Sequence, residues 1–370
     1  MARGRGLYQK IAEPDNLRLA FKKATRGKSD KPDVIEYRRN LDENLIKLRN
    51  MLLSGEIESG PYHFFVVRDP KERIISAAPF TDRVLHHAVM NICEPVFEKY
   101  AIHDSYACRA GKGLHSALKR AQFYSRQYSW YLKLDFRKYF DSIHHETLKT
   151  LLAKTFRDKR LNALFDVVIA SYETAPGRGL PIGNLLSQHF ANFYLGNMDH
   201  WLKETRGIGG YLRYMDDFLL FGSDRELLKA ELGEVEDYTD RKLRLRIKDN
   251  RQLNRSCLGI PFLGFRIFPH IVRLLPRSRK RFADKLKQYE RETLAGCMTE
   301  EQLVRKVTSI VSFTKAAEAA GFRRAVIHRQ GVWSGRAPTV SIGAEAGTMT
   351  RLTNGHPIAT TTTRTIATTI

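Results

Sequence analysis

The sequence predicts an α+β fold in which an antiparallel sheet is backed by helices. Residues 62–80 and 210–222 each read as a hairpin, because two runs of apolar, aromatic or β-branched residues flank a short polar turn. Residues 15–55 carry apolar residues at helical spacing, and residues 277–325 read as helical and basic. With 370 residues, of which 42% are apolar, the chain is long enough for two or three subdomains.

The elements of the first half follow from local signals. The turn of the 62–80 hairpin is the segment RDPKE. Thr81 is the expected N-cap of a helix that ends near Pro95. Residues 130–140 predict a strand that ends in a turn, and a further helix begins directly after it.

The second half alternates in the same way. Residues 180–204 read as a loop that leads into a long apolar helix, and the strand–MDD–strand hairpin follows. A charged helix is expected over 224–242, with short strands over 243–247 and 260–269. Residues 331–370 are rich in threonine and lack periodicity, which predicts a disordered, low-complexity tail.

The composition indicates a polyanionic partner. The formal net charge of +22 suggests nucleic acid or an acidic membrane face, with an ordinary basic surface as the alternative. No apolar run has the length of a membrane span, and residues 1–15 lack the apolar core of a signal peptide, so we expect a cytoplasmic protein with no membrane contact. The four cysteines lack metal-ligand spacing and are expected to be reduced, mostly buried thiols: Cys93, Cys108, Cys257 and Cys297.

Three carboxylates are candidates for a metal site. Asp135 ends one predicted strand, and Asp216 and Asp217 occupy the turn of the 210–222 hairpin. If these strands are neighbours, the carboxylates converge and repel one another unless cations lie between them. Mg²⁺ prefers oxygen ligands and also takes substrate phosphates, and two such ions can activate a hydroxyl and stabilise leaving pyrophosphate. The alternative is that the Asp-Asp pair is only a turn dipeptide.

Several motifs, in this order, resemble those of the reverse transcriptases. YMDDF resembles the catalytic hairpin, LKLDFRKYFDSI the strand with the first aspartate, LPIGNLLSQHFANFYL the nucleotide-binding loop and helix, and LGIPFLGFRI the primer-grip hairpin. The resemblance covers about residues 7–330 and implies a right-hand polymerase. The expected parts are an N-terminal extension and fingers with the start of the palm over 1–120, a palm over 121–270 with a fingers segment near 145–183, and a helical thumb over 271–330.

The resemblance assigns roles to individual residues. Asp135, Asp216 and Asp217 would hold two Mg²⁺ ions, with Mn²⁺ as an alternative, and the backbone carbonyl of Phe136 would be an extra ligand. Phe140 matches a steric gate that excludes a ribose 2′-hydroxyl and selects deoxynucleotides, although it can also be a core phenylalanine. The implied partners are dNTPs, a template RNA and a DNA or cDNA primer.

Further positions are assigned to nucleotide or nucleic-acid binding. Arg73 matches the fingers arginine that contacts the incoming triphosphate, and Arg68 and Lys71 are weaker candidates in the same hairpin. Arg109 and Lys112 would contact the template or nucleotide backbone, with surface charge as the alternative for Lys112. Gly264 lies in the segment that resembles the primer grip and would contact nucleic acid. The basic helices over 15–50 and 277–325 would bind the template–primer backbone.

One loop narrows the resemblance to a subgroup. Reverse transcriptases generally carry Gln and Pro where this chain has Ile182 and Gln188. The loop sequence with Ile182 and Gln188 is similar to that of the enzymes of diversity-generating retroelements, and Gly183 in the same loop would lie at the nucleotide site. An isoleucine can only pack where a glutamine would position the sugar, so we expect error-prone copying opposite template adenines, unless fidelity is set elsewhere.

The subgroup implies mutagenic retrohoming that diversifies a protein, with a bacterial, archaeal or phage origin. It also implies a small, basic, oligomeric accessory variability protein as partner. The alternatives are a retron, phage-defence or group II intron-type reverse transcriptase, or a catalytically inactive RNA-binding scaffold.

Overall fold

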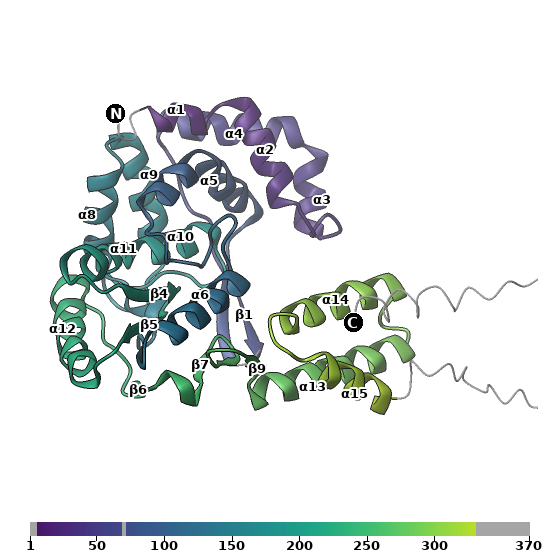
Figure 1. The fold of residues 1–370 in the computed structure, drawn as a ribbon. Helices are drawn as coiled ribbons and strands as arrows, with labels where there is room; N and C mark the ends of the chain where they lie inside the picture. Colours follow the sequence, from purple (N-terminus) through teal and green to yellow (C-terminus); the bar gives the residue numbers. More distant parts are fainter. Residues whose placement is uncertain (1–5, 69–71, 331–370) are drawn as a thin grey trace, which may run out of the picture. The chain divides into compact units, whose positions relative to one another are not determined.

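The computed structural model describes residues 6–68 and 72–330, which fall into two compact units, Met1–Ser256 and Cys257–Ile370 (Figure 1). The predicted tail over 331–370 lies outside the described residues, as does Lys71. Each unit combines helices with antiparallel strands, so the predicted α+β class is confirmed. Among the described residues, no helix is both long and apolar enough to cross a membrane.

Four helices form the N-terminal part of the first unit: α1 (Leu7–Ile11), α2 (Pro14–Ala24), α3 (Pro32–Arg39) and α4 (Leu41–Ser54). Proline opens both α2 and α3, where its missing N–H costs no helical hydrogen bond. The apolar stripe of α2, with Leu17 and Ala20 buried, packs on α5 (Phe80–Tyr100). The predicted helical spacing over 15–55 is therefore confirmed.

The 62–80 hairpin is formed by β1 (His63–Arg68) and β2 (Glu72–Ala77), which pair antiparallel as predicted. The helix after it differs from the prediction. Thr81 is not the N-cap, because α5 already begins at Phe80, and the helix continues through Pro95 to Tyr100. Its buried residues pack against α2 and α10 (Leu185–Tyr194), and this packing compensates for the backbone hydrogen bond that proline cannot donate.

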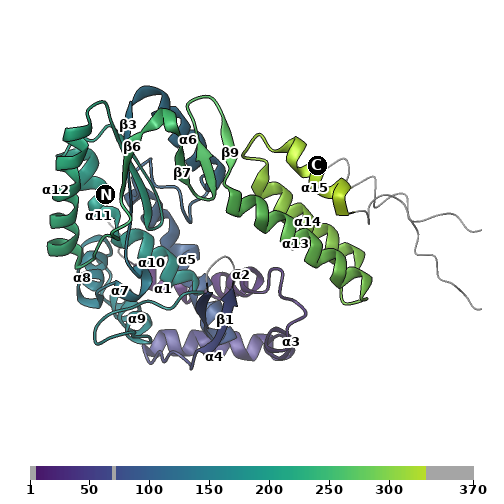
Figure 2. The ribbon, with the colours of Figure 1, turned by 90° about the horizontal axis from the view of Figure 1, so that it is seen from below.

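The central sheet has four antiparallel strands in the order β4-β5-β3-β6. These are β3 (Trp130–Asp135), β4 (Gly210–Tyr214), β5 (Asp217–Gly222) and β6 (Gln252–Arg255). The sheet lies between α12 (Arg225–Leu243) and α6 (Leu114–Gln127), as Figure 2 shows. The predicted strand over 243–247 is wrong: α12 runs to Leu243, and only an isolated bridge between Phe136 and Ile247 follows.

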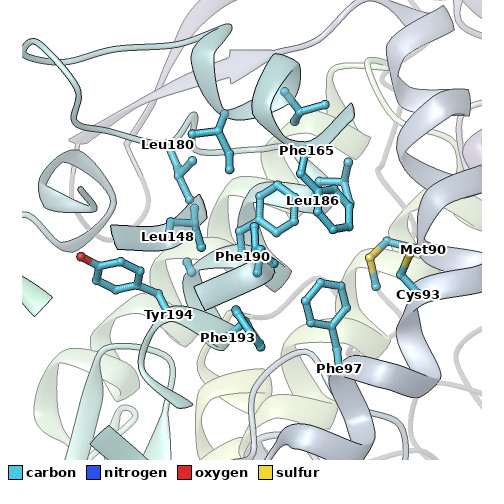
Figure 3. Packing of buried hydrophobic residues seen from close by; sticks show 14 of the residues in the cluster. Met90, Cys93, Phe97, Leu148, Phe165, Leu180, Leu186, Phe190, Phe193 and Tyr194 are labelled. Atoms are coloured by element: carbon cyan, nitrogen blue, oxygen red, sulfur yellow. The ribbon is translucent and has the colours of Figure 1, made fainter. Parts of the chain in front are cut away.

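The remaining helices of this unit complete the core behind the sheet: α7 (Tyr139–Ser142), α8 (His145–Thr155), α9 (Lys159–Ala170), α11 (Gly196–His200) and the π-helical turn η1 (Trp201–Thr205). Aromatic rings pack together with leucines in this core (Figure 3). The ring centroids of Phe97 and Phe193 are 5.5 Å apart, and those of Phe165 and Phe190 are 5.2 Å apart. Both pairs are in T-shaped, edge-to-face contact. Such packing anchors the long apolar helix that the 180–204 pattern predicted.

The second unit combines a small sheet with a helical group. The sheet contains β7 (Ile260–Phe262), β8 (Phe265–Ile267) and β9 (Val272–Leu274), after the 3₁₀ turn η2 (Ser256–Leu258) that links the units. The helices are α13 (Pro276–Leu294), α14 (Glu300–Thr314) and α15 (Ala320–Gln330), as predicted over 277–325. Their buried residues form a separate core that includes Leu286 and Val307. A capping box between Thr299 and Gln302 starts α14.

The cysteine prediction is only partly right. The four thiols are free, but only Cys93 is buried, and Cys108, Cys257 and Cys297 are exposed. The three exposed thiols lie in turns and loops, where the sequence carries no apolar periodicity that would indicate burial.

Candidate active site

The three predicted carboxylates lie at one end of the central sheet. Strands β4 and β5 are joined by Met215 and Asp216, with Met215 in the left-handed region at φ 54°. Asp217 begins β5 and is the cross-strand partner of Asp135, the last residue of β3. Side chains alternate along a strand, so Lys133 and Asp135 share the face opposite the one that Leu132 and Leu134 bury in the core.

This arrangement concentrates negative charge in a partly dry environment. Burial raises the pKa of Asp217 to about 7. The ammonium of Lys133 opposes this shift in pKa, and the charges of Asp135 and Asp216 reinforce it. Burial, with the neighbouring charge of Asp135 next in size, raises the pKa of Asp216 to about 6. The charged forms are thus disfavoured because the carboxylates lack sufficient compensation.

Two lysines that the sequence analysis missed supply part of this compensation. Lys133 Nζ lies 3.1 Å from Asp217 Oδ1, and Lys248 Nζ contacts Asp135 Oδ2. Lys248 is carried there by the segment after α12, because its backbone N–H donates to the carbonyl of Asp135. No local pattern could have revealed Lys248, since it is 113 residues from Asp135 in the chain.

The donor set fits a hard divalent cation. The Oδ1 atom of Asp135 is buried and accepts no hydrogen bond, and the buried Oδ1 atom of Asp217 faces the ammonium of Lys133. Phe136 and Ile247 face each other in an isolated bridge. Its hydrogen bonds run from the N–H of Arg137 to the carbonyl of Arg246 and from the N–H of Lys248 to the carbonyl of Asp135, so the carbonyl of Phe136 takes no part in them. Across the described residues, no three His, Cys, Asp or Glu side chains already surround one point as a metal requires. The oxygen donors are therefore adjacent but do not form a closed cage.

Beneath the hairpin turn lies a buried ion pair that the sequence analysis also missed. Arg213 is 1% and Asp199 is 0% exposed, and the guanidinium Nε lies 2.7 Å from Asp199 Oδ1. The same guanidinium donates to the carbonyl of Met215 at 2.9 Å and to the side chain of Asn192 at 2.7 Å. An arginine inside an otherwise apolar strand was the available signal, because a buried charge needs a buried partner.

The predicted nucleotide loop is attached to the β1–β2 hairpin. The N–H of Ser76 donates to the carbonyl of Ile182 at 2.8 Å. Gly183 has φ 118°, and a Cβ there would lie 2.7 Å from the side chain of Ile75, so only glycine fits this approach. Gln188 lies in the first turn of α10. Its amide oxygen accepts a hydrogen bond of 3.7 Å from the thiol of Cys108.

The two phenylalanines after Asp135 have different environments. Phe136 is 1% exposed and stacks on Phe218 with ring centroids 5.4 Å apart, so its ring belongs to the core. Phe140 is half-buried at the edge of the same core, and its carbonyl accepts the N–H of Leu180 at 2.9 Å. A partly exposed ring beside the strand end leaves open the expected gate role.

The remaining candidates do not gather at the carboxylates in one cluster. Arg68 and Arg73 lie on the exposed β1–β2 hairpin, where Arg68 pairs with Glu72 at 2.9 Å. Arg109 bonds Glu98 and the carbonyls of Ile102 and Ser105. The Nζ of Lys112 donates to the carbonyl of His103, and Gly264, at φ 91° in the second unit, accepts from the hydroxyl of Ser278. Arg109 therefore has an internal structural role, whereas Arg73 remains available to a ligand.

Comparison with known proteins adds relatives of several kinds. Protein YkfC of Escherichia coli (strain K12) is 23% identical over 320 residues, covering 74% of this chain and 82% of that protein. The group II intron-encoded protein LtrA of Lactococcus lactis subsp. cremoris is 25% identical over 216 residues, and the match spans only 35% of its length. Among solved structures, apo telomerase from Candida tropicalis aligns with a TM-score of 0.49 and 14% identity, over 74% of this chain and 60% of that one.

The family match covers β2 and the whole central sheet described above. Residues 68–267, more than half of the chain, match the family described as reverse transcriptase (RNA-dependent DNA polymerase). The matched range contains Asp135, Asp216 and Asp217, the bonded loop at Ile182, and the strands that bring them together. The chain belongs to the reverse transcriptase family, with the mixed helical and antiparallel-sheet fold of that polymerase.

Proposed function

We propose that this protein is an error-prone RNA-directed DNA polymerase of a diversity-generating retroelement. It would copy a template-repeat RNA into cDNA with errors opposite template adenines, for mutagenic retrohoming. The observation that carries the polymerase assignment is the placement of Asp135 opposite Asp217, with Asp216 in the adjoining turn. The subgroup rests on Ile182 and Gln188 in the nucleotide loop.

In the proposed mechanism the three aspartates and the carbonyl of Phe136 would hold two Mg²⁺ ions. When bound, Mg²⁺ supplies Lewis acidity to the primer 3′-hydroxyl and neutralises charge on leaving pyrophosphate. The chain's own part is to position: Arg73 would hold the triphosphate of the incoming dNTP, and Phe140 would exclude a ribose 2′-hydroxyl. The buried Arg213 would fix the carbonyl of Met215 and so the direction of the aspartate pair.

Primer extension on an RNA template with a DNA primer, dNTPs and Mg²⁺ tests the polymerase assignment. Asp216→Asn should lower extension by at least about a thousandfold, because several kcal/mol of charge stabilisation depend on the bound ions. Asp249→Asn, a change of the same kind at an exposed position, serves as the matched control. Equal extension by wild type and Asp216→Asn would exclude these carboxylates from catalysis. Replacing Mg²⁺ with Mn²⁺ in the same assay tests the alternative ion.

The error spectrum tests the subgroup. The bond from Ser76 fixes the backbone of Ile182, so Ile182→Gln changes mainly what its side chain offers to the incoming sugar. We expect fewer misincorporations opposite adenine in Ile182→Gln and unchanged errors opposite the other bases. An unchanged adenine error rate in this variant would remove Ile182 as the cause. A small, basic, oligomeric accessory protein is the partner proposed for this subgroup.

A group II intron-type enzyme is the second candidate. It is favoured by the similarity to LtrA and to nuclear intron maturase 4 of Arabidopsis thaliana, which is 27% identical over 202 residues. The match covers 35% of the first and 25% of the second protein. Accurate copying of adenines by the wild-type chain would favour this candidate over the diversity-generating type.

A further inference from the structure

A basic cavity lies in the first unit, apart from the carboxylates. It has a volume of about 620 Å³ and opens to solvent. It is lined by residues from three segments of the chain, 137–142, 178 and 240–246: Arg137, Lys138, Ser142, Arg178, Asp240, Arg241, Arg244 and Arg246. Six of these eight residues are cationic and one is acidic, and a volume of this size can accept a ligand larger than a single phosphate ion.

Most of the cations in this cavity have no anionic partner. Arg241 pairs with Asp237 at 2.7 Å. Among the described residues, none of the other five cations makes an ion pair: Arg137, Lys138, Arg178, Arg244 and Arg246. Their mutual repulsion is unfavourable unless a polyanion or counter-ions occupy the cavity. Basic residues at the C-terminal end of α12 complement its dipole, but this explains only Arg241 and Arg244.

The backbone holds this cluster in a defined and strained arrangement. Lys138 (φ 44°) and Arg244 (φ 53°) both adopt the left-handed conformation, which costs a non-glycine residue roughly 1 kcal/mol or more. The guanidinium of Arg178 donates to the carbonyls of Ser142 and Arg244, at 3.3 and 3.2 Å. The N–H of Arg137 donates to the carbonyl of Arg246 at 2.9 Å. These bonds tie the three segments together around the cavity.

The cavity is close to the carboxylates but is not formed by them. Neither Asp135, Asp216 nor Asp217 lines it. Part of its wall comes from the C-terminal end of α12, which packs on the sheet. Arg137 nevertheless comes two residues after Asp135, the end of β3, and Arg246 comes two residues before Lys248. An anion bound here would therefore be close to the site without occupying the positions of the proposed metal ligands.

We propose that this cavity is a phosphate-binding site for an extended polyphosphate anion. Arginine forks match phosphate oxygens in pairs, and exposed arginines and lysines around an open cavity suit several linked phosphates better than one caged ion. The linked phosphates can come from an RNA segment outside the template–primer duplex or from a free polyphosphate such as pyrophosphate. This proposal goes beyond the polymerase assignment and does not depend on the error-prone subtype.

The test compares two triple variants of the full chain. The cavity variant carries Lys138→Gln, Arg244→Gln and Arg246→Gln. The control variant removes the same charge from exposed positions on α8, α9 and their connection: Lys154→Gln, Arg157→Gln and Lys159→Gln. Neither set includes a proposed metal ligand, and circular dichroism with thermal unfolding checks that both variants fold like the wild type.

Binding is measured in two assays, without Mg²⁺ and over a range of salt concentrations. The first uses a short single-stranded RNA without a primer, and the second uses inorganic pyrophosphate. Selective loss of RNA affinity in the cavity variant, by about tenfold and with a shallower salt dependence, would identify RNA phosphates as the ligand. Selective loss of pyrophosphate binding would identify a free polyphosphate. If the cavity and control variants bind both probes equally, the proposal is overturned.

Discussion

Replacement of Arg213 is predicted to destabilise the first unit far more than replacement of an exposed arginine. Arg213→Ala leaves Asp199, which is fully buried, without its cation and removes the donor to the carbonyl of Met215. Breaking a buried pair on one side costs about 3–5 kcal/mol. At roughly 2–4 °C per kcal/mol for a domain of this size, the thermal midpoint should fall by about 10 °C.

Tryptophan fluorescence can follow the first unit alone. Of the three tryptophans, Trp130 and Trp201 lie in the described part of this unit, and Trp201 stacks on Tyr238 at 4.2 Å. A Trp333→Phe background removes the third. Arg18→Ala is the control, because Arg18 pairs with Asp42 on the surface and such pairs are worth at most about 1 kcal/mol.

A double-mutant cycle separates the ion pair from simple loss of volume. Asp199→Asn keeps an oxygen that can accept the hydroxyl of Tyr211, which now lies 2.6 Å from Asp199 Oδ1. Combining Asp199→Asn with Arg213→Met removes both charges. The loss of stability in the double variant should therefore be smaller than the sum of the two single losses, by about 2 kcal/mol or more. Effects that add within about 0.5 kcal/mol would refute the assignment of a coupled pair.

Three further predictions follow from individual sites. Phe140→Ala should allow ribonucleotide incorporation in primer extension, and continued rejection of ribonucleotides would remove its gate role. Gly183→Ala should shift thermal unfolding more than Gly27→Ala, since only at Gly183 would the new Cβ meet another side chain; equal shifts would contradict this. Burial lowers the pKa of His86 to about 4. Its neutral form stabilises the fold above pH 6.5, and this stability, about 3 kcal/mol, is lost as the pH falls through 4. His86→Gln should flatten that part of the stability–pH curve, and an equally steep curve would exclude burial of a neutral imidazole.

The elements that depend on local pattern could be predicted from the sequence. The 210–222 hairpin has two apolar runs around a short polar turn, so the hairpin and the place of the aspartate pair at its tip could be predicted directly. The helix after β2 was placed wrongly at both ends, because Pro95 is normally a helix breaker and tertiary packing overrides it here. The 243–247 segment has alternating burial but no partner strand beyond one bridge.

The features that come from distant parts of the chain could not be predicted. Lys248 reaches Asp135 only because the segment after α12 returns to the end of β3. The basic cavity gathers residues between Arg137 and Arg246 that share no sequence motif. Arg213 is intermediate: its position in an apolar strand signals a buried partner, but Asp199 could be named only from the fold.

Three cations near the aspartates have different consequences for the proposed binding of metal ions. Arg213 is completely buried, keeps its charge at any accessible pH and bonds the carbonyl of Met215, so it holds the backbone of the turn. Lys133 and Lys248 are partly exposed, and each contacts a carboxylate through a flexible side chain. The proposed divalent ions would displace such lysines without disturbing the turn, because the hydrogen bonds of Arg213 go to Asp199, Asn192, Ser105 and the carbonyl of Met215 and not to the carboxylates of Asp216 or Asp217. We therefore expect the hairpin to keep one conformation while its counter-ions change.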